Sequence, residues 1–480
     1  MWKNWKIIAR AMLALLAGGC VIAPPGLKDQ QKSLKAAGAP YTRPVGKRDL
    51  PYVPFQPTWQ QILRRAFLAD ADLEVAYDQW AGAVAKVSEA GAYPNTPATV
   101  GFNYLFSSAQ MTSWDRTTLT IAPDAMTDLS LPSKLSAAST AALDDAKAAA
   151  QRFYAAKFAV QRKVLVGYAE LVAMDQKLRI QQENVDLLAE LEQEAQTRVQ
   201  AGGMQRELIT SQVDLQMARN ELLSMRAQHE QMEAALNVLM GRDAEAAILV
   251  PPEMPNARPL PADDGTLLTV AVDLNPELAA LAEQVQGRQD AIQVAKMQYL
   301  PDINPAAAIT GNLSQSIGAI VTLPFTSPKI NAQVQEAEAA LAESQAFARQ
   351  TRENRAASFV VALIALRDDE RAANLLQNEV LPRAAEAVQW TRDAYSAGQA
   401  GFTDLIEAQR ILLQVRTQIV EARMDREKQL AQLEELAGRD LGTLQPLPFF
   451  KQRQRPLRLH DEKGPSKPRT QPSPDEIFIQ

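Results

Sequence analysis

Apolar and polar side chains alternate in four short stretches of the chain. In the first, Val100, Phe102 and Tyr104 share one face of an extended strand. The pattern predicts two β-hairpins, with strands at about 96–106, 117–131, 303–311 and 315–325. Each strand is about ten residues long, which is the length that a tilted strand needs to cross a bilayer.

Between and after the hairpins, the apolar positions follow a helical period over very long distances. No proline occurs from Ser133 to Val250, which predicts one helix of roughly 68 residues, or about 100 Å, ending near Gln200. A globular core does not require a helix of this length. Glycines then predict a turn at 201–203, and a return helix follows from about 206 to 239.

The same order recurs in the second half of the chain. A helix of roughly 68 residues is predicted from Ser327 to about Tyr395, with a kink at Pro382, followed by a turn at Ala397-Gly398 and a return helix to Leu436. Short motifs recur at an offset of 197 residues: Glu207-Leu208-Ile209 as Asp404-Leu405-Ile406, and Gly241-Arg242-Asp243 as Gly438-Arg439-Asp440. This offset is too long for a solenoid repeat, so we interpret the chain as a duplicated half-domain, 58–250 and 251–445.

The N-terminal residues have the pattern of a secretion signal. Residues 1–19 combine basic side chains with a short apolar run, and small residues directly precede Cys20, as in a bacterial lipobox. Such a signal predicts that Cys20 is acylated and becomes the first mature residue, although an ordinary signal peptide remains the alternative. Val21, rather than Asp, at the next position favours the outer membrane. Residues 20–57 are expected to be a lipid-anchored, extended tether.

Composition narrows the function. The two histidines, His229 and His460, have no partners at a metal-ligand spacing, and Cys20 is the single cysteine. The net charge of −6 and the lack of a stripe of basic residues argue against nucleic-acid binding. We find no hydrolase or phosphate-binding motif, so we expect neither an enzyme nor a cofactor. Few aromatic and many alanine residues suit coiled-coil-like helix packing, and the polar tail 446–480 is expected to be disordered.

The predicted strands indicate an oligomer. Four strands cannot close a water-filled barrel, and an open sheet edge in lipid leaves unpaired backbone groups. Other copies of the chain must therefore complete the sheet, and three copies give a twelve-stranded barrel. The predicted fold class is mainly α with a small β part, in which the strands form a trimeric barrel and the long helices a tunnel. A small soluble sheet that caps a helical rod is the alternative.

This order of elements resembles the outer-membrane efflux protein family, the TolC-like channel-tunnels, over about 59–441. The segments that carry the resemblance are Ala394-Tyr395-Ser396-Ala397-Gly398, Asp404-Leu405-Ile406-Glu407, Asn275-Pro276-Glu277-Leu278 and Tyr299-Leu300-Pro301. The resemblance implies a homotrimer in the outer membrane whose tunnel extends about 100 Å into the periplasm. It also implies a periplasmic adaptor and an inner-membrane pump as partners.

The resemblance places a periplasmic gate at Tyr395, Asp404 and Glu407. The two acidic residues are three positions apart in the first helical turn, where the helix dipole alone favours carboxylates. In the family, acidic residues here line the tunnel entrance, so three copies would form a carboxylate ring that attracts cations. The Arg that usually pairs with the tyrosine has no match, because Ala400 stands there.

The two predicted helical turns are the expected docking sites for the adaptor, at Gly202, Gly203, Glu207 and Gly398. For Glu207, stabilisation of the helix N-terminus is the preferred interpretation. Two alternatives to an efflux duct stay open: the outer-membrane duct of a type I polypeptide secretion system, and a periplasmic adaptor lipoprotein. The sequence does not identify the exported substrate.

Overall fold

The computed structural model describes most of the chain between residues 21 and 441. The described residues are 21–93, 98–106, 111–123, 130–202, 204–255, 257–258, 260, 264, 267, 275–311, 314–325 and 327–441. They belong to one compact unit, Met1–Gln445. Cys20, the signal segment and the tail 446–480 lie outside the described residues, and so does Gly203. Among the described helices, none is both long enough and apolar enough to span a membrane.

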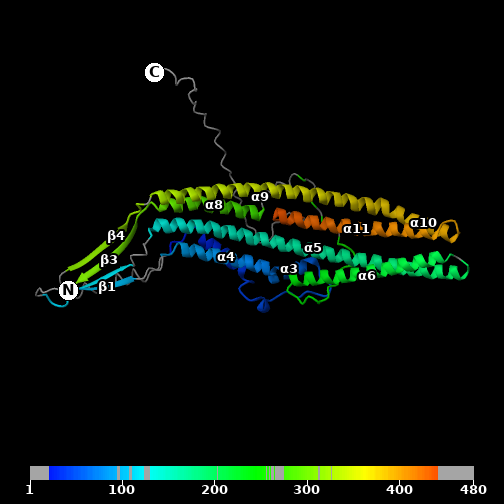
Figure 1. Ribbon diagram of the computed structural model, residues 1–480, viewed down its shortest axis with the longest axis horizontal. Coiled ribbons are helices and arrows are strands. Elements are labelled where there is room, and N and C mark those ends of the chain that lie inside the picture. The colour runs from blue at the N-terminus through cyan, green and yellow to red at the C-terminus, as the bar shows by residue number, and fades with distance from the viewer. Residues whose placement is uncertain are drawn as a thin grey trace, which may run out of the picture. The chain divides into compact units, whose positions relative to one another are not determined.

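Long helices dominate the described residues (Figure 1). The first half contains α3 (Trp59–Ala69), α4 (Ala71–Ala90), α5 (Pro132–Gln200) and α6 (Gln205–Leu239). The second half contains α8 (Pro276–Met297), α9 (Ser327–Leu375), a π-helical turn (Leu376–Val380), α10 (Leu381–Ser396) and α11 (Phe402–Ala437). The 69-residue α5 confirms the length predicted for the first long helix.

Local sequence signals fix where several helices begin. The Gln61 side chain accepts from the Thr58 backbone N–H at 2.9 Å at the start of α3. The Asp70 carboxylate caps α4 by accepting from the Leu73 N–H at 3.1 Å. Asn275 caps α8 and also donates to the Leu436 carbonyl at 2.7 Å, so this cap joins α8 to the end of α11. Pro132 occupies the first turn of α5, where its missing N–H costs no helical bond.

The second long helix is interrupted, as the proline predicted. The interruption consists of the π-helical turn Leu376–Val380, which directly precedes Leu381 and Pro382. The Pro382 ring cannot donate to a carbonyl one turn earlier, and the π-helical turn accommodates this missing bond.

Helix α5 is the central element of the helical layer. It packs against α4 and α6 from its own half and against α8 and α11 from the other half, while α9 packs against α8 and α11 (Figure 1). The largest apolar cluster surrounds the fully buried Trp80 and Phe153, whose ring centroids lie 5.7 Å apart. A second cluster joins Phe359 and Leu366 of α9 to Leu430 and Leu433 of α11.

The four described strands form one antiparallel sheet in the order β1-β2-β3-β4. They span Ala98–Tyr104, Thr117–Pro123, Asp302–Thr310 and Ser314–Thr322. β2 pairs with β3, with Thr118 opposite Thr310, so the two predicted hairpins join within one chain. Of the second strand, predicted at 117–131, the structure describes Thr117–Pro123, and residues 124–129 lie outside the described residues. The fourth ends at Thr322 rather than 325.

The N-terminal segment differs from the extended tether that we expected. Residues Leu27–Gly38 form a helix, α2, which packs against α4 and α5. The Ile22 N–H donates to the Gly91 carbonyl at 2.9 Å, and the buried Tyr41 hydroxyl donates to the Phe67 carbonyl at 2.6 Å. The composition of the segment, rich in Pro, Gly and Lys, concealed the few apolar side chains, Leu27 and Tyr41 among them, that hold it on the helices.

Buried charges hold the segment around Arg258, which connects the two halves of the chain, against α11. We call this segment the strap. Arg258, in the segment after α6, forms ion pairs with Glu434 at 2.8 Å and Glu427 at 3.4 Å, and Arg426 donates to the Arg258 carbonyl at 2.7 Å. Burial raises the pKa of Glu434 to about 7, with Arg258 opposing the rise. Paired charges of this kind keep the strap on α11 because an unpaired buried charge is costly.

Candidate functional site at the paired helical turns

The two turns predicted to act together lie at the same end of the helical layer. The α5–α6 turn and the α10–α11 turn follow helices that run side by side (Figure 1). One apolar cluster joins all four helices at this end. Its buried members are Val185, Leu188, Leu191, Leu215, Ala218, Leu222, Tyr395, Phe402, Leu405 and Ile406. Turns that are almost 200 residues apart in the sequence are thus packed as one unit.

Glycine allows both turns to be tight. Gly202 has a φ of 95° and Gly398 a φ of 71°, which is the left-handed region that other residues seldom adopt. In the first turn of α6, Glu207 is half-buried. Its position matches the helix N-terminal role expected for it, where the dipole favours a carboxylate.

Tyr395 is the buried centre of this end. Its side chain is only 4 % exposed, and its ring lies 6.1 Å from the ring of Phe402, centroid to centroid. The hydroxyl oxygen is buried and has no hydrogen-bond partner. Burial raises the pKa of Tyr395, and the nearby Arg198 guanidinium opposes this rise. The ring therefore contributes packing, whereas its hydroxyl carries the cost of an unsatisfied polar group.

Arg198 is the residue that sequence reasoning missed. Its guanidinium carbon lies 4.0 Å from the centroid of the Tyr395 ring, a cation–π contact, and it donates to Glu194 at 2.9 Å. The expected arginine was absent from the second turn, where Ala400 instead packs on the apolar cluster. Arg198 comes from the last turn of α5, just before the first of the two turns.

Asp404 and Glu407 are both exposed, in contrast to Tyr395. Asp404 Oδ2 accepts from the Gly401 N–H at 2.9 Å, which caps α11, and Glu407 lies 3.4 Å from Arg410, one turn along. These contacts agree with the interpretation that both carboxylates are stabilised by their position at the start of α11. The carboxylates remain at the surface, where three copies could bring them together.

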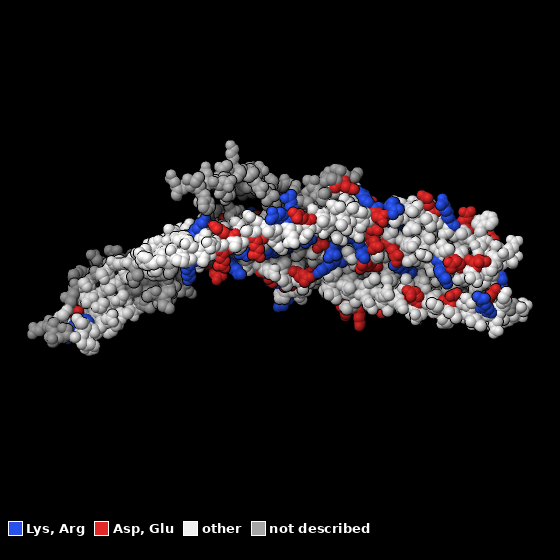
Figure 2. All heavy atoms as spheres, turned by 45° about the horizontal axis from the view of Figure 1, so that its top comes forward, with Lys and Arg blue, Asp and Glu red and all other residues white. Residues whose placement is uncertain are grey.

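The sheet has one apolar and one small polar face. Cross-strand partners point to the same side, so Phe102, Leu119 and Ile309 share a face, while Thr118, Thr310 and their neighbours share the other. On the apolar face Phe102 is 67 % and Ile317 84 % exposed. On the polar face the Thr118 and Thr310 hydroxyls lie 3.0 Å apart. The described sheet shows few charges, whereas the helices carry both signs (Figure 2).

Both lateral margins of the chain present exposed apolar side chains. On α6 these are Ile209, Val213 and Met217, spaced four residues apart on one helical face. On the opposite margin, α9 and α10 expose Val361, Ile364 and Trp390, the last at 71 %. The sheet likewise ends in two strands, β1 and β4, that lack a partner on their outer side within the described residues. In the described part of the chain no group of acidic, His or Cys side chains could hold a metal ion.

The fold is that of known outer-membrane channels. The outer membrane protein VceC from Vibrio cholerae superposes with a TM-score of 0.67 at 18% identity, covering 80% of this chain and 96% of that one. The Campylobacter jejuni CmeC outer membrane channel gives 0.67 at 16%, covering 80% and 86%. The open state of the Neisseria gonorrhoeae MtrE outer membrane channel gives 0.65 at 17%, covering 80% and 89%.

The sequence supports the same class. Residues 267–439 match the model of the family described as outer membrane efflux protein, which confirms the resemblance drawn from the motifs of the second half. Among curated proteins there is no match to the chain. The family and the structural neighbours are channel proteins and not enzymes.

Proposed function

We propose that this chain is the outer-membrane subunit of a tripartite efflux system, a passive duct through which small molecules leave the cell. The observation that carries the proposal is the pair of open margins. The sheet ends in β1 and β4, and the helical layer ends in α6 and α9–α10, with apolar side chains exposed on both helical margins. The two margins are built from different elements, so in this proposal α6 of one copy contacts α9–α10 of the next, and the head-to-tail contacts close into a ring.

Three copies are the proposed number. They supply twelve strands, which suffices for a barrel with a water-filled lumen, in line with the family resemblance. In this arrangement the apolar sheet face with Phe102 and Ile317 contacts lipid, and the small polar face with Thr118 and Thr310 lines the pore. Acyl chains on Cys20 are proposed to add a lipid anchor in the outer membrane.

The end with the paired turns is proposed as the periplasmic entrance. Tyr395, held by Arg198 and the shared apolar cluster, packs the two turns together, and this contact favours a closed entrance. Asp404 and Glu407 from three copies form the carboxylate ring. The turns with Gly202, Gly203, Glu207 and Gly398 are the proposed contact with a periplasmic adaptor, which joins the duct to an inner-membrane pump.

Single-channel recording of the full-length protein in planar bilayers tests this proposal. We expect discrete cation-favouring channels that divalent cations block from the side of the turns. In the double variant Asp404→Asn with Glu407→Gln, the block weakens because the ring loses its charge. Glu386→Gln, an exposed acid on α10, is the matched control and leaves the block unchanged. Absence of any channel refutes the duct, and unchanged block in the double variant refutes the ring.

A further inference from the structure

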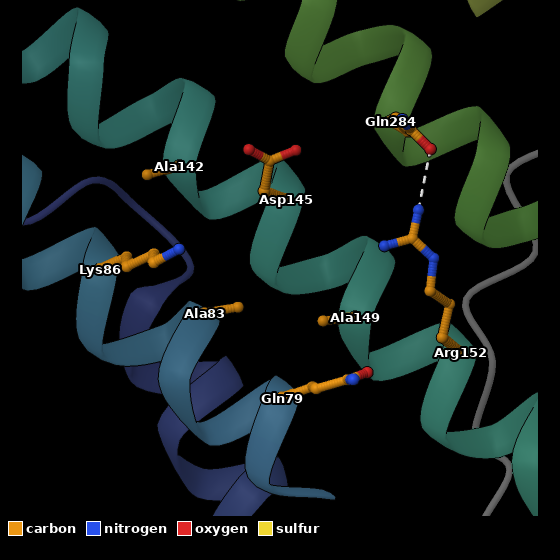
Figure 3. Close-up of a pocket in the computed structure, with 8 residues that line it drawn as sticks. All are labelled: Gln79, Ala83, Lys86, Ala142, Asp145, Ala149, Arg152 and Gln284. Carbon is orange, nitrogen blue, oxygen red and sulfur yellow. Dashed lines mark hydrogen bonds between the residues drawn. The ribbon is translucent and has the colours of Figure 1, made fainter. Parts of the chain in front are cut away.

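A groove lies between three helices, well away from the paired turns (Figure 3). It has a volume of about 320 Å³ and runs between α4 and α5, with α8 on its far side. Its lining residues are Gln79, Ala83, Lys86, Ala142, Asp145, Ala149, Arg152 and Gln284. The volume is at the lower end of the range of small-molecule sites, roughly 300–1,000 Å³.

The floor of the groove is apolar and its two ends are polar (Figure 3). Ala83, Ala142 and Ala149 have no atoms beyond Cβ, so they leave open space between the helices. Because α4 and α5 contribute their residues in opposite order along the groove, Lys86 and Asp145 lie toward one end, and Gln79 and Arg152 toward the other. The first end thus contains opposite charges, whereas the second contains a cation and amides.

The cation at the second end is oriented but not neutralised. Arg152 Nη2 donates to the Gln284 side-chain oxygen at 2.8 Å, which is a neutral acceptor. Within the described residues, neither Arg152 nor Lys86 forms an ion pair, whereas the neighbouring Lys147 pairs with Asp144 at 2.5 Å and with Glu283 at 3.6 Å. A guanidinium whose remaining N–H groups are free is suited to bind a carboxylate or related anion.

The polar residues that α5 contributes to the groove, Asp145 and Arg152, lie opposite to Leu143 on the helix, and the N-terminal segment also reaches Phe153 through Tyr41. Leu143 contacts that segment, since a Cβ on Gly26 would lie 3.5 Å from the Leu143 side chain. Asp145 and Arg152 follow Leu143 by two and nine residues, about 200° and 180° around the helix. The proposed acyl anchor, next to residue 21, can reach lipid only from outside the duct. In the proposed duct, this places the face of α5 that carries Asp145 and Arg152 on the side of the lumen.

From this geometry we propose that the groove is a binding site in the tunnel wall for small amphiphilic organic anions. This inference rests on the proposed duct function, and it names the class of molecule that pauses there. The apolar body of the ligand lies along the three alanines. Its anionic head accepts from Arg152 and from the amides of Gln79 or Gln284. The formal charges of Lys86 and Asp145 at the other end sum to zero without an ion pair between them, so the net charge of the lining equals that of Arg152.

Calorimetry on the full-length protein in lipid nanodiscs tests the site. The probe is naphthalene-2-carboxylate, and the neutral naphthalene-2-carboxamide is its matched control, with empty nanodiscs subtracted. We expect the carboxylate to bind more tightly than the amide. Arg152→Gln should weaken carboxylate binding roughly fivefold, as expected for one partly exposed charge, and leave amide binding unchanged. Asp145→Asn should tighten carboxylate binding, because a negative charge is removed from the lining of the groove.

The variant Lys35→Gln, an exposed cation of α2 on the other face of α5, is the matched control and should not change binding. Equal affinity for carboxylate and amide, or an equal effect of Lys35→Gln and Arg152→Gln, overturns the site. The same samples are recorded in planar bilayers. If channels form but carboxylate binding is not selective, the binding site is refuted and the duct proposal stands. If binding is selective but no channels form, the duct proposal is refuted and an anion site on α5 remains.

Discussion

The two long helical rods of the chain have similar lengths and different surroundings. α5 is one uninterrupted helix of 69 residues, buried along much of its length between α4, α6, α8 and α11. The corresponding rod, α9 with α10, is interrupted by a π-helical turn, and α9 buries only Ile330, Phe359, Ala362, Leu363 and Leu366. Length therefore does not show what a helix does in this protein. One rod is already enclosed within the chain, and the other has an open side, which we propose as the contact with a second copy.

A charge on the open side of α9 tests most directly whether that side is an interface between copies. Ile364→Glu on α9 should abolish assembly, because the side chain, 65 % exposed in one chain, becomes buried against a neighbour in the ring. Native mass spectrometry in detergent gives the number of copies. Arg349→Glu, a charge reversal at an exposed position of the same helix, is the control. Intact trimers of Ile364→Glu would show that this margin is not an interface.

A truncation in the enclosed rod should act on folding instead. Phe153→Ala removes a fully buried ring that packs on Trp80, and we expect a loss of about 3–5 kcal/mol in the free energy of unfolding. Val361→Ala on α9, where the side chain is 67 % exposed, should change it by less than about 0.5 kcal/mol in the unassembled chain. Denaturant unfolding followed by circular dichroism measures both. Equal losses would contradict the contrast between the rods.

The free energy of unfolding should depend on pH through Glu434, which pairs with Arg258 of the strap. Its folded pKa is raised to about 7 from 4.5, so the folded chain binds the proton more tightly than the unfolded chain. Its contribution to stability is therefore present below pH 4.5 and is lost as the pH rises through 7, by at most about 3 kcal/mol. Glu434→Gln should remove this dependence, as followed by thermal unfolding across that range. A variant with an unchanged pH slope would assign the slope to other carboxyl groups.

The smallest effect is expected where the rods meet at the paired turns. Tyr395→Phe removes a buried hydroxyl without a partner, so the free energy of unfolding should stay equal or rise by about 1 kcal/mol.

Arg198→Gln removes the cation over the Tyr395 ring and should increase the open probability in single-channel recording by a few-fold, for a contact of about 1 kcal/mol. If Tyr395→Phe opened the channel as much as Arg198→Gln, the hydroxyl and not the ring would hold the turns.

Much of the fold could be predicted because the period of the apolar positions agreed with the positions of proline and glycine. The proline-free stretch after Ser133 predicted α5, and Pro382 marked the interruption of the second rod. The fourth strand was predicted to end at 325, because the apolar alternation at Leu323 and Phe325 continues beyond the strand that ends at Thr322. The α2 helix was missed because its stability comes from contacts with α4 and α5 that its own composition does not reveal.

The candidate site was predicted in part, for a similar reason. Gly202, Gly398 and Tyr395 were found because turns and motifs are local in the sequence. Arg198 was missed because its contact with Tyr395 joins residues almost 200 positions apart, and no local pattern in the last turn of α5 points to that ring.

The π-helical turn at Leu376–Val380 also sets the angular phase of the helix that follows it. Such a turn holds one residue more than an α-helical path over the same rise. Winding the same residues as regular α-helix would therefore rotate α10 by about 100°, whereas deleting one residue there would keep its present phase. With all residues retained and wound as α-helix, the change would reach the paired turns. Tyr395 would then turn away from Arg198, although neither residue had been altered. An interruption more than twenty ångströms from the turns, at 1.5 Å per residue, thus sets the direction of the side chain that packs them together.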